Sequence, residues 1–171
     1  MMTKNSTTKK TLGLFVFIVL SSVVCFAQTS SRGLLSHLQG SWSMKGTVLK
    51  KPVIYSADGA WVLRNQFLSF HMKDASQPPA YEATLFIGID SAKKHYVAHW
   101  LDSFGGAGAR VVALGPLSEE KIEVIYPYEE GRFRNIFKYD SRNDEWSLVI
   151  ESERDGKLWS VFAEYRIIRK R

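Results

Sequence analysis

The sequence predicts an all-β protein, an antiparallel up-and-down barrel of about ten strands. From Gly40 onward, β-branched and aromatic residues alternate with polar ones in runs of about six to ten residues, separated by Gly, Asp, Asn and Pro. No segment after residue 40 shows the 3.6-residue repeat of an amphipathic helix. Without a helix to cover it, such a sheet must close on itself or form a sandwich. Closure into a barrel is favoured because it removes the exposed edges.

Eleven runs are predicted as strands, and the second and third are short enough to form one kinked strand. The runs lie at residues 41–50, 53–56, 60–64, 67–72, 81–90, 94–102, 110–115, 121–128, 132–139, 145–154 and 157–168. Residues with turn chemistry separate several of them, namely Asp58-Gly59, Glu130-Gly131, Arg142-Asn143-Asp144 and Asp155-Gly156. Alternation places five residues of the last run on one apolar face: Trp159, Val161, Ala163, Tyr165 and Ile167.

The first 27 residues are predicted to be a secretory signal peptide. Three lysines precede an apolar run at residues 12–24, and small residues occupy the third-last and last positions of the segment, Cys25 and Ala27. A bilayer span needs about 20 apolar residues, so the run fits a cleaved signal better than a membrane anchor. We therefore expect a periplasmic or secreted protein with no transmembrane segment in the mature chain. Lipid attachment at Cys25 is not expected, because the preceding Val24 is not small.

Residues 28–39 are predicted to be a short lead-in with one helical turn near residues 34–38, and residues 40–171 a single barrel domain. The formal net charge of the whole chain is +6. Three of its 23 basic residues and none of its acidic ones fall in the predicted signal, which leaves +3. This near-balance argues against a nucleic-acid-binding surface. Cys25 is the only cysteine, so the mature protein would have no disulfide and no cysteine metal site.

Gly40-Ser41-Trp42 opens the first predicted strand, and Arg166 lies in the last. This arrangement resembles the calycin pattern, in which Gly-x-Trp packs under a basic residue of the terminal strand. Calycins include lipocalins, fatty-acid-binding proteins and nitrobindin-like haem barrels. The resemblance implies structural roles for Gly40, Trp42 and Arg166.

A closer resemblance is to an uncharacterised family of exported bacterial proteins that are predicted to be calycin-like barrels. It rests on Phe67-Leu68 after a turn, on the Gly88-Ile89-Asp90 turn, and on a Tyr-x-x-x-Trp-x-Asp-Ser strand from Tyr96 to Ser103. The similarity covers most of residues 38–168 and implies a fold but no activity. The nitrobindin-like branch implies haem held by a histidine of a late strand. Because no histidine follows residue 131, we expect no cofactor.

No metal site and no catalytic residue are predicted. His95 and His99 share a strand face, but four residues of strand separate them by roughly 13 Å, too far for one metal ion. His99 and Asp102 are three residues apart and point to opposite faces, which disfavours an acid–base pair.

Two polar residues are candidates for contact with a ligand. Asp102 shares a strand face with Tyr96 and Trp100, so its carboxylate ends an aromatic row and could orient a ligand hydroxyl or amine. Its alternative role is to cap the turn into residues 103–106. Asn135 lies between Phe133 and Phe137 on an otherwise apolar face, where its amide must find a partner in the protein, in water or in a ligand.

Three functions remain open from the sequence. The first is an exported barrel that binds a small apolar or amphipathic molecule, with the site Trp61, Trp100, Asp102, Tyr126, Phe133 and Asn135. The second is a filled barrel that acts as an interaction or structural protein of the cell envelope through the loops at residues 73–80 and 103–110. The third is an enzyme that uses Asp102 as an acid at the barrel mouth. The first is favoured because small barrels commonly hold one small ligand.

Overall fold

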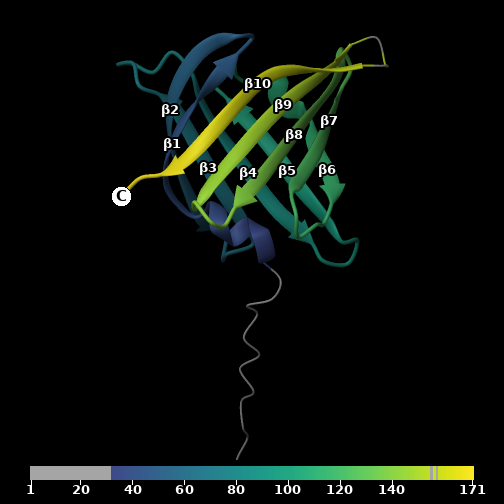
Figure 1. The fold of residues 1–171 in the computed structure, drawn as a ribbon. Helices are drawn as coiled ribbons and strands as arrows, with labels where there is room; N and C mark the ends of the chain where they lie inside the picture. The colour runs from purple at the N-terminus through teal and green to yellow at the C-terminus, as the bar shows by residue number, and fades with distance from the viewer. Residues whose placement is uncertain (1–31, 155, 157) are drawn as a thin grey trace, which may run out of the picture.

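The computed structural model describes residues 32–154, 156 and 158–171, and these form a closed antiparallel barrel of ten strands (Figure 1). Each strand pairs with the next along the chain, and β1 pairs with β10 to close the sheet. The predicted all-β up-and-down barrel is confirmed. The predicted signal peptide, residues 1–27, lies outside the described residues.

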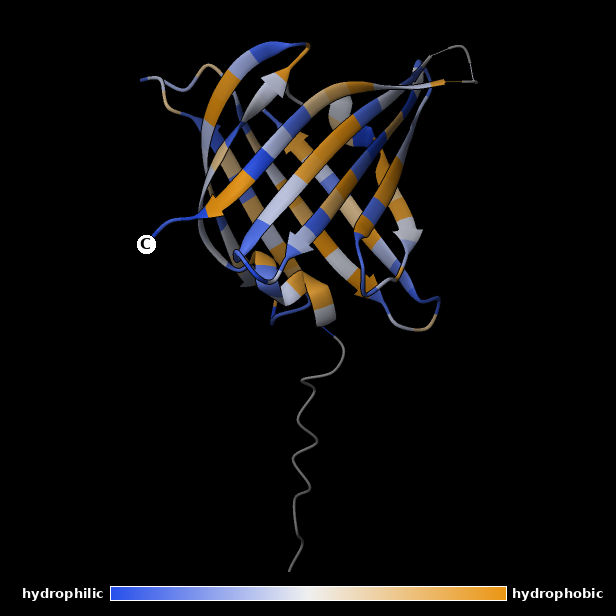
Figure 2. Cartoon of the chain, in the orientation of Figure 1, coloured by the Kyte–Doolittle hydropathy of each residue, from blue (hydrophilic) through white to orange (hydrophobic). Residues whose placement is uncertain are grey.

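The strands are β1 (Gly40–Val48), β2 (Lys51–Val62), β3 (Phe67–Asp74), β4 (Glu82–Asp90), β5 (His95–Asp102), β6 (Val112–Pro116), β7 (Ile122–Tyr128), β8 (Gly131–Asp140), β9 (Glu145–Arg154) and β10 (Leu158–Arg169). Two 3-10 helices accompany them, η2 (Gly33–Leu38) before the barrel and η3 (Gly108–Arg110) between β5 and β6. Neither of these helices is long and apolar enough to cross a membrane. Figure 2 shows hydrophobic and hydrophilic residues alternating along the strands, as expected when one face of a sheet is buried.

The second and third predicted runs form the single strand β2, and the predicted turn at Asp58-Gly59 is wrong. Both residues lie within β2, where Gly59 is buried. A Cβ atom on Gly59 would overlap the carbonyl oxygen of Leu38, so this glycine allows η2 to approach the strand. The first hairpin instead turns at Leu49-Lys50, which have φ angles of 49° and 66°.

One end of the barrel is closed by η2, which lies across it in Figure 1. Leu35 and Leu38 of this helix are fully buried. The indole nitrogen of Trp42 donates to the carbonyl of Leu38 at 2.9 Å, and that of Trp146 donates to the carbonyl of His37 at 3.4 Å. The last carbonyls of η2 are therefore satisfied by side chains of the barrel.

Side chains fill the barrel interior next to η2. The fully buried ones include Trp42, Met44, Leu68, Phe70, Met72, Leu85, Ile87, Ile122, Val124, Phe137, Trp146, Leu148 and Ile167. The ring of Phe137 meets the rings of Phe70 and Trp146 edge to face, with centroids 6.4 Å apart in both contacts. This packing gives the closed half a continuous hydrophobic core.

The basic residue that lies over Trp42 is Arg169, which corrects the role expected for Arg166. The guanidinium carbon of Arg169 is 4.0 Å from the Trp42 ring centroid. Its nitrogens also donate to Asp144 and to the carbonyls of Gln39 and His37. Arg166 has the opposite strand parity and points outward, where it forms a two-point ion pair with Glu145 at 2.7 Å. The calycin-like contact is therefore present, three residues later in the chain.

A bulge in β10 overturns part of the predicted face of the last strand. The register of β10 against β9 shifts between Val161 and Ala163. As a result Val161 points outward and is 56% exposed, while Phe162 turns towards the interior. Trp159 also lies outside, where the guanidinium of Arg134 covers its ring at 4.5 Å. Alternation cannot reveal such a bulge, because one extra residue exchanges the two faces.

We predict that Arg169→Ala lowers the free energy of unfolding by about 2 kcal/mol, because it removes a cation–π contact and charged hydrogen bonds at the closed end. Arg166→Ala is the matched control and should change stability little, since its ion pair is exposed. Urea unfolding followed by tryptophan fluorescence measures both variants. An equal loss of stability in the two variants would contradict the role given to Arg169.

Candidate functional site

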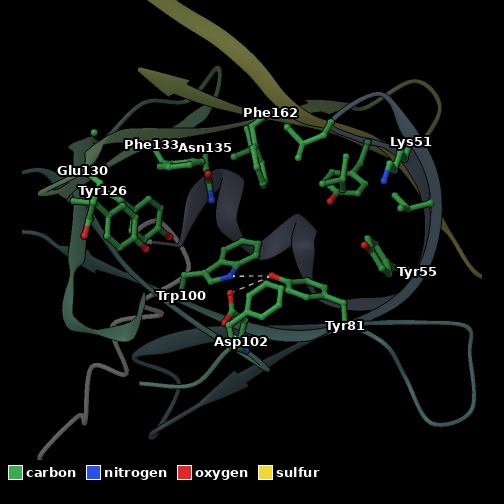
Figure 3. A pocket seen from close by; sticks show the side chains of 18 residues that line it. Lys51, Tyr55, Tyr81, Trp100, Asp102, Tyr126, Glu130, Phe133, Asn135 and Phe162 are labelled. Carbon is green, nitrogen blue, oxygen red and sulfur yellow. Dashed lines mark hydrogen bonds between the residues drawn. The ribbon is translucent and has the colours of Figure 1, made fainter. Parts of the chain in front are cut away.

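The half of the barrel opposite η2 contains a cavity of about 730 Å³ (Figure 3). Its walls come from the β1–β2 and β7–β8 hairpins, Tyr81 just before β4, the end of β5 with Phe104, Ile150 of β9 and the bulged part of β10. Ligand-binding cavities in proteins typically measure about 300–1,000 Å³, so this one is large enough for a small organic molecule. The open half of the barrel is thus hollow, whereas the closed half is filled.

Five of the six predicted ligand-binding residues line this cavity: Trp100, Asp102, Tyr126, Phe133 and Asn135. The inward face of β5 carries Tyr96, Trp100 and Asp102, the face on which the sequence had placed the aromatic row. Contact of these residues with a ligand stays a prediction.

Trp61 is the exception and does not line the cavity. It has the strand parity of Tyr55, which does, but it is six residues further along β2, roughly 20 Å away. There it packs against the core, and the guanidinium carbon of Arg32 lies 4.6 Å from its ring centroid. The alternation therefore gave the correct face for Trp61, but its position along the strand places it at the closed end.

Asp102 both caps a turn and faces the cavity. Its Oδ1 atom accepts a hydrogen bond from the backbone N–H of Phe104 at 3.0 Å, as expected for a residue that ends a strand. Its Oδ2 atom accepts from the Tyr81 hydroxyl at 3.4 Å, and that hydroxyl accepts from the indole N–H of Trp100 at 3.2 Å. Figure 3 shows this chain of three side chains on one wall of the cavity. The two roles that the sequence left open are therefore compatible.

Aromatic rings form most of the remaining wall. Tyr55 contacts Tyr81 and Tyr165 with ring centroids 5.9 and 5.8 Å apart. On the other side, Phe133 meets Tyr128 and Phe162 edge to face at 5.9 and 5.4 Å. The predicted site did not include Tyr55, Tyr81, Tyr128, Phe162 or Tyr165. Strand parity could have found Tyr55 and Tyr165, but only their distance from η2 separates them from core residues.

Two fully buried polar atoms in the cavity wall have no hydrogen-bond partner in the described structure. They are the hydroxyl oxygen of Tyr126 and the side-chain oxygen of Asn135, in residues that are each 2% exposed. Burial raises the pKa of Tyr126, and the neighbouring Tyr128 raises it further, so the hydroxyl stays protonated and available as a donor. Because a buried polar group without a partner costs free energy, both atoms favour a bound molecule that can pair with them.

The other buried tyrosines of the wall are neutral as well. Burial raises the pKa of Tyr81, and the negative charge of Asp102 adds to the effect. Burial likewise raises the pKa of Tyr165, together with its neighbours Tyr55 and Tyr81. The wall therefore presents hydroxyl groups and ring faces, and its charged groups are confined to Lys51, Asp102 and Glu130.

None of the four histidines lines the cavity. His37 stacks on Tyr139 at 4.4 Å, His71 pairs with Glu82 at 2.8 Å, and His95 and His99 contact the carbonyls of Lys93 and Ala109. The histidine ligand that the nitrobindin-like resemblance implies for haem is thus missing from the cavity wall, and these residues do not fit that group. The described residues contain no cluster of three side chains suited to a metal ion.

Comparison with known proteins supports the fold. No protein-family model matches the chain, and no curated protein matches its sequence. Among solved structures, the crystal structure of Rv2717c from M. tuberculosis is similar, with a TM-score of 0.56 and 15% sequence identity. The match covers 80% of this chain and 95% of that chain. At this identity the likeness shows a shared barrel fold and nothing about the ligand.

We predict that Tyr126→Phe leaves stability unchanged or raises it by up to about 1 kcal/mol, because it removes a buried hydroxyl that has no partner. Tyr96→Phe is the matched control. Tyr96 is equally buried, but its hydroxyl donates to the carbonyl of Ser118 at 2.8 Å, so its loss should cost about 1 kcal/mol. Thermal unfolding of both ligand-free variants tests this, and an equal loss in Tyr126→Phe would mean that its hydroxyl is already bonded in the free protein.

Proposed function

We propose that this protein binds a small apolar or amphipathic molecule in the open half of its barrel. The observation that carries the proposal is the cavity of about 730 Å³ whose largely aromatic wall contains two buried polar atoms without partners. Binding sites for small molecules have this character, a mostly apolar wall with a few polar groups that fix orientation. A barrel filled by its own side chains, the second function considered, would have no such cavity.

Tyr126 and Asn135 are the polar anchors in this proposal. Tyr126 of β7 lies opposite Phe133 of β8, and Asn135 is two residues further along β8. The Cα atoms of such diagonal neighbours on one face of a sheet are about 7–8 Å apart, so both side chains can reach the same part of a bound molecule. The tyrosine hydroxyl donates and the asparagine oxygen accepts. A ligand hydroxyl or amide, which can both accept and donate, satisfies the two atoms together.

The aromatic rings around these anchors bind the body of the ligand. Phe133, Tyr128 and Phe162 meet edge to face, which leaves ring faces and edges directed at the cavity. At the mouth, Phe104 is 80% exposed although it borders the cavity. A large exposed apolar side chain at this place is suited to cover a bound molecule.

We propose further that residues 1–27 direct export, so that the protein meets its ligand in the periplasm or outside the cell. The support is the sequence pattern of a short basic segment followed by an apolar one.

Native mass spectrometry of the protein, after expression of the full chain in a bacterium, tests ligand binding and export together. We expect a chain that begins at Gln28, with an additional mass that is lost on denaturation. A chain that retains residues 1–27 would contradict export. Protein without additional mass, after expression in several bacterial hosts, would show that no ligand stays bound during purification. The dye titration below would then decide whether the cavity binds a ligand.

The neutral dye N-phenyl-1-naphthylamine tests whether the cavity is the binding site. We expect its fluorescence to rise saturably with wild-type protein, and its affinity to fall about tenfold or more in Val53→Trp, because Val53 lines the cavity and a tryptophan would obstruct it. Ile54→Trp is the matched control, since Ile54 is the next residue of β2, points outward and is 56% exposed. Equal affinities in the two variants, or no dye binding at all, would overturn the proposal.

A further inference from the structure

We propose that the ligand carries a positively charged amine and that Asp102 is the counter-ion of this amine in the cavity. The inference rests on the proposed ligand-binding function and narrows it to one chemical class, organic cations with an apolar or aromatic body. Four observations carry it: the unused hydrogen-bonding capacity of Asp102, the charges of the cavity, the rings around the carboxylate, and the unpartnered polar atoms on the opposite wall.

Asp102 has room for another hydrogen-bond donor. A carboxylate offers about four lone-pair positions, and the described structure uses two, one for the backbone N–H of Phe104 and one for the Tyr81 hydroxyl. The contact with Tyr81 is long at 3.4 Å, so Oδ2 is held only weakly. An ammonium group carries several N–H donors and would form the stronger, charge-assisted bond.

No basic side chain among the described residues pairs with Asp102. None of the ion pairs among the described residues includes it. Among residues 32–154, 156 and 158–171, those that line the cavity include two carboxylates, Asp102 and Glu130, and a single basic side chain, Lys51. In Figure 3, Lys51 lies well away from Asp102, beyond Tyr81 and Tyr55. Because a half-buried charge is most stable when paired, this imbalance favours a cationic ligand.

The same charges disfavour a fatty acid or another anion. No arginine and no histidine lines the cavity, and Lys51 is exposed at its mouth. A carboxylate that entered the interior would therefore approach Asp102 without a nearby positive charge. Like charges at such a distance repel each other, which would lower the affinity.

Aromatic rings surround the position of the proposed ammonium group. The Trp100 indole is fixed by its hydrogen bond to Tyr81, and the Tyr81 ring lies 5.6 Å from that of Phe104. The negative charge of Asp102 also reaches Tyr128, where it raises the pKa of a hydroxyl already shifted upward by burial. Ring faces attract cations through their quadrupole, and a carboxylate beside several rings is suited to a substituted ammonium ion.

The unpartnered atoms of Tyr126 and Asn135 define the other end of the site. In Figure 3, Asn135 lies across the cavity from Asp102, with the Trp100 ring between them. A ligand that reaches both would place its amine at Asp102, its apolar body against Trp100, and a hydroxyl or amide at the buried pair.

The experiment compares three compounds that share a naphthalene ring and carry a cationic, a neutral and an anionic substituent at pH 7: 1-naphthylmethylamine, 1-naphthylmethanol and 1-naphthoic acid. Calorimetric titration at pH 7 and low salt measures their affinities for the wild-type protein. We expect the amine to bind about tenfold more tightly than the alcohol, and the acid to bind more weakly than both. In D102N the amine should lose this advantage, because asparagine keeps the cap on Phe104 but not the charge.

D90N is the matched control. Asp90 also ends a strand and caps a turn, with its Oδ1 atom accepting from the N–H groups of Ala92 and Lys93 at 3.1 Å, but it lies outside the cavity. The preference for the amine should survive in D90N. If the alcohol binds and the amine binds no more tightly, or if the preference persists in D102N, the cationic ligand is excluded while ligand binding stands. If none of the three compounds and no neutral dye binds, the proposed function itself is overturned. Should D102N fail to fold, the ranking of the three compounds on the wild-type protein still decides the question.

Discussion

A closed sheet of ten strands encloses more space than its inward side chains fill, because the diameter of a barrel grows with the number of strands. This protein meets the constraint differently at its two ends. At one end, two tryptophans and the helix η2 add enough volume to make a solid core. At the other end the only helix among the described residues is the short η3, which buries no side chain, and the rings of the wall leave a cavity. The site exists because the filling stops halfway along the barrel.

The solid end depends on polar contacts as much as on apolar packing. A short helix laid across a barrel brings its last carbonyls out of water, and each must be paired. Two indole N–H groups and the guanidinium of Arg169 supply the donors. Arg169 therefore connects the helix, the first strand through Trp42 and the β8–β9 hairpin through Asp144. The cavity end has the opposite arrangement, with polar atoms of Tyr126 and Asn135 left without partners. Stability is concentrated at one end of the barrel and binding capacity at the other.

The sequence predicted the barrel well because a strand with one buried face has a period of two, and ten strands repeat that signal. It also grouped Trp100 with Asp102, and Phe133 with Asn135, on shared strand faces, but it left open which face of the strand at residues 94–102 points inward. The structure shows that these four residues and Tyr126 line the cavity. Three features escaped it for identifiable reasons. The bulge in β10 exchanged the two faces for Val161 and Phe162. Whether Trp61 lies at the closed or at the open end of the barrel depends on where η2 packs against the strands, which the alternation within one strand does not show. The pair Asp58-Gly59 is typical of a turn, but Gly59 lies within β2, where the absence of a side chain lets the backbone of Leu38 approach closely.

The described chain both enters and leaves the barrel at its closed end. Gly40 follows η2 directly, and the backbone N–H of Lys170 donates to Ser41 at 2.8 Å, so the final residues stay beside the first strand. The mouth of the cavity lies at the opposite end of the barrel. Whatever is joined to the chain after Arg171, whether a surface, a reporter or a second domain, would therefore be held on the side away from the mouth. In such a fusion the mouth of the barrel would point away from the attached partner, and the cavity would remain accessible from solution.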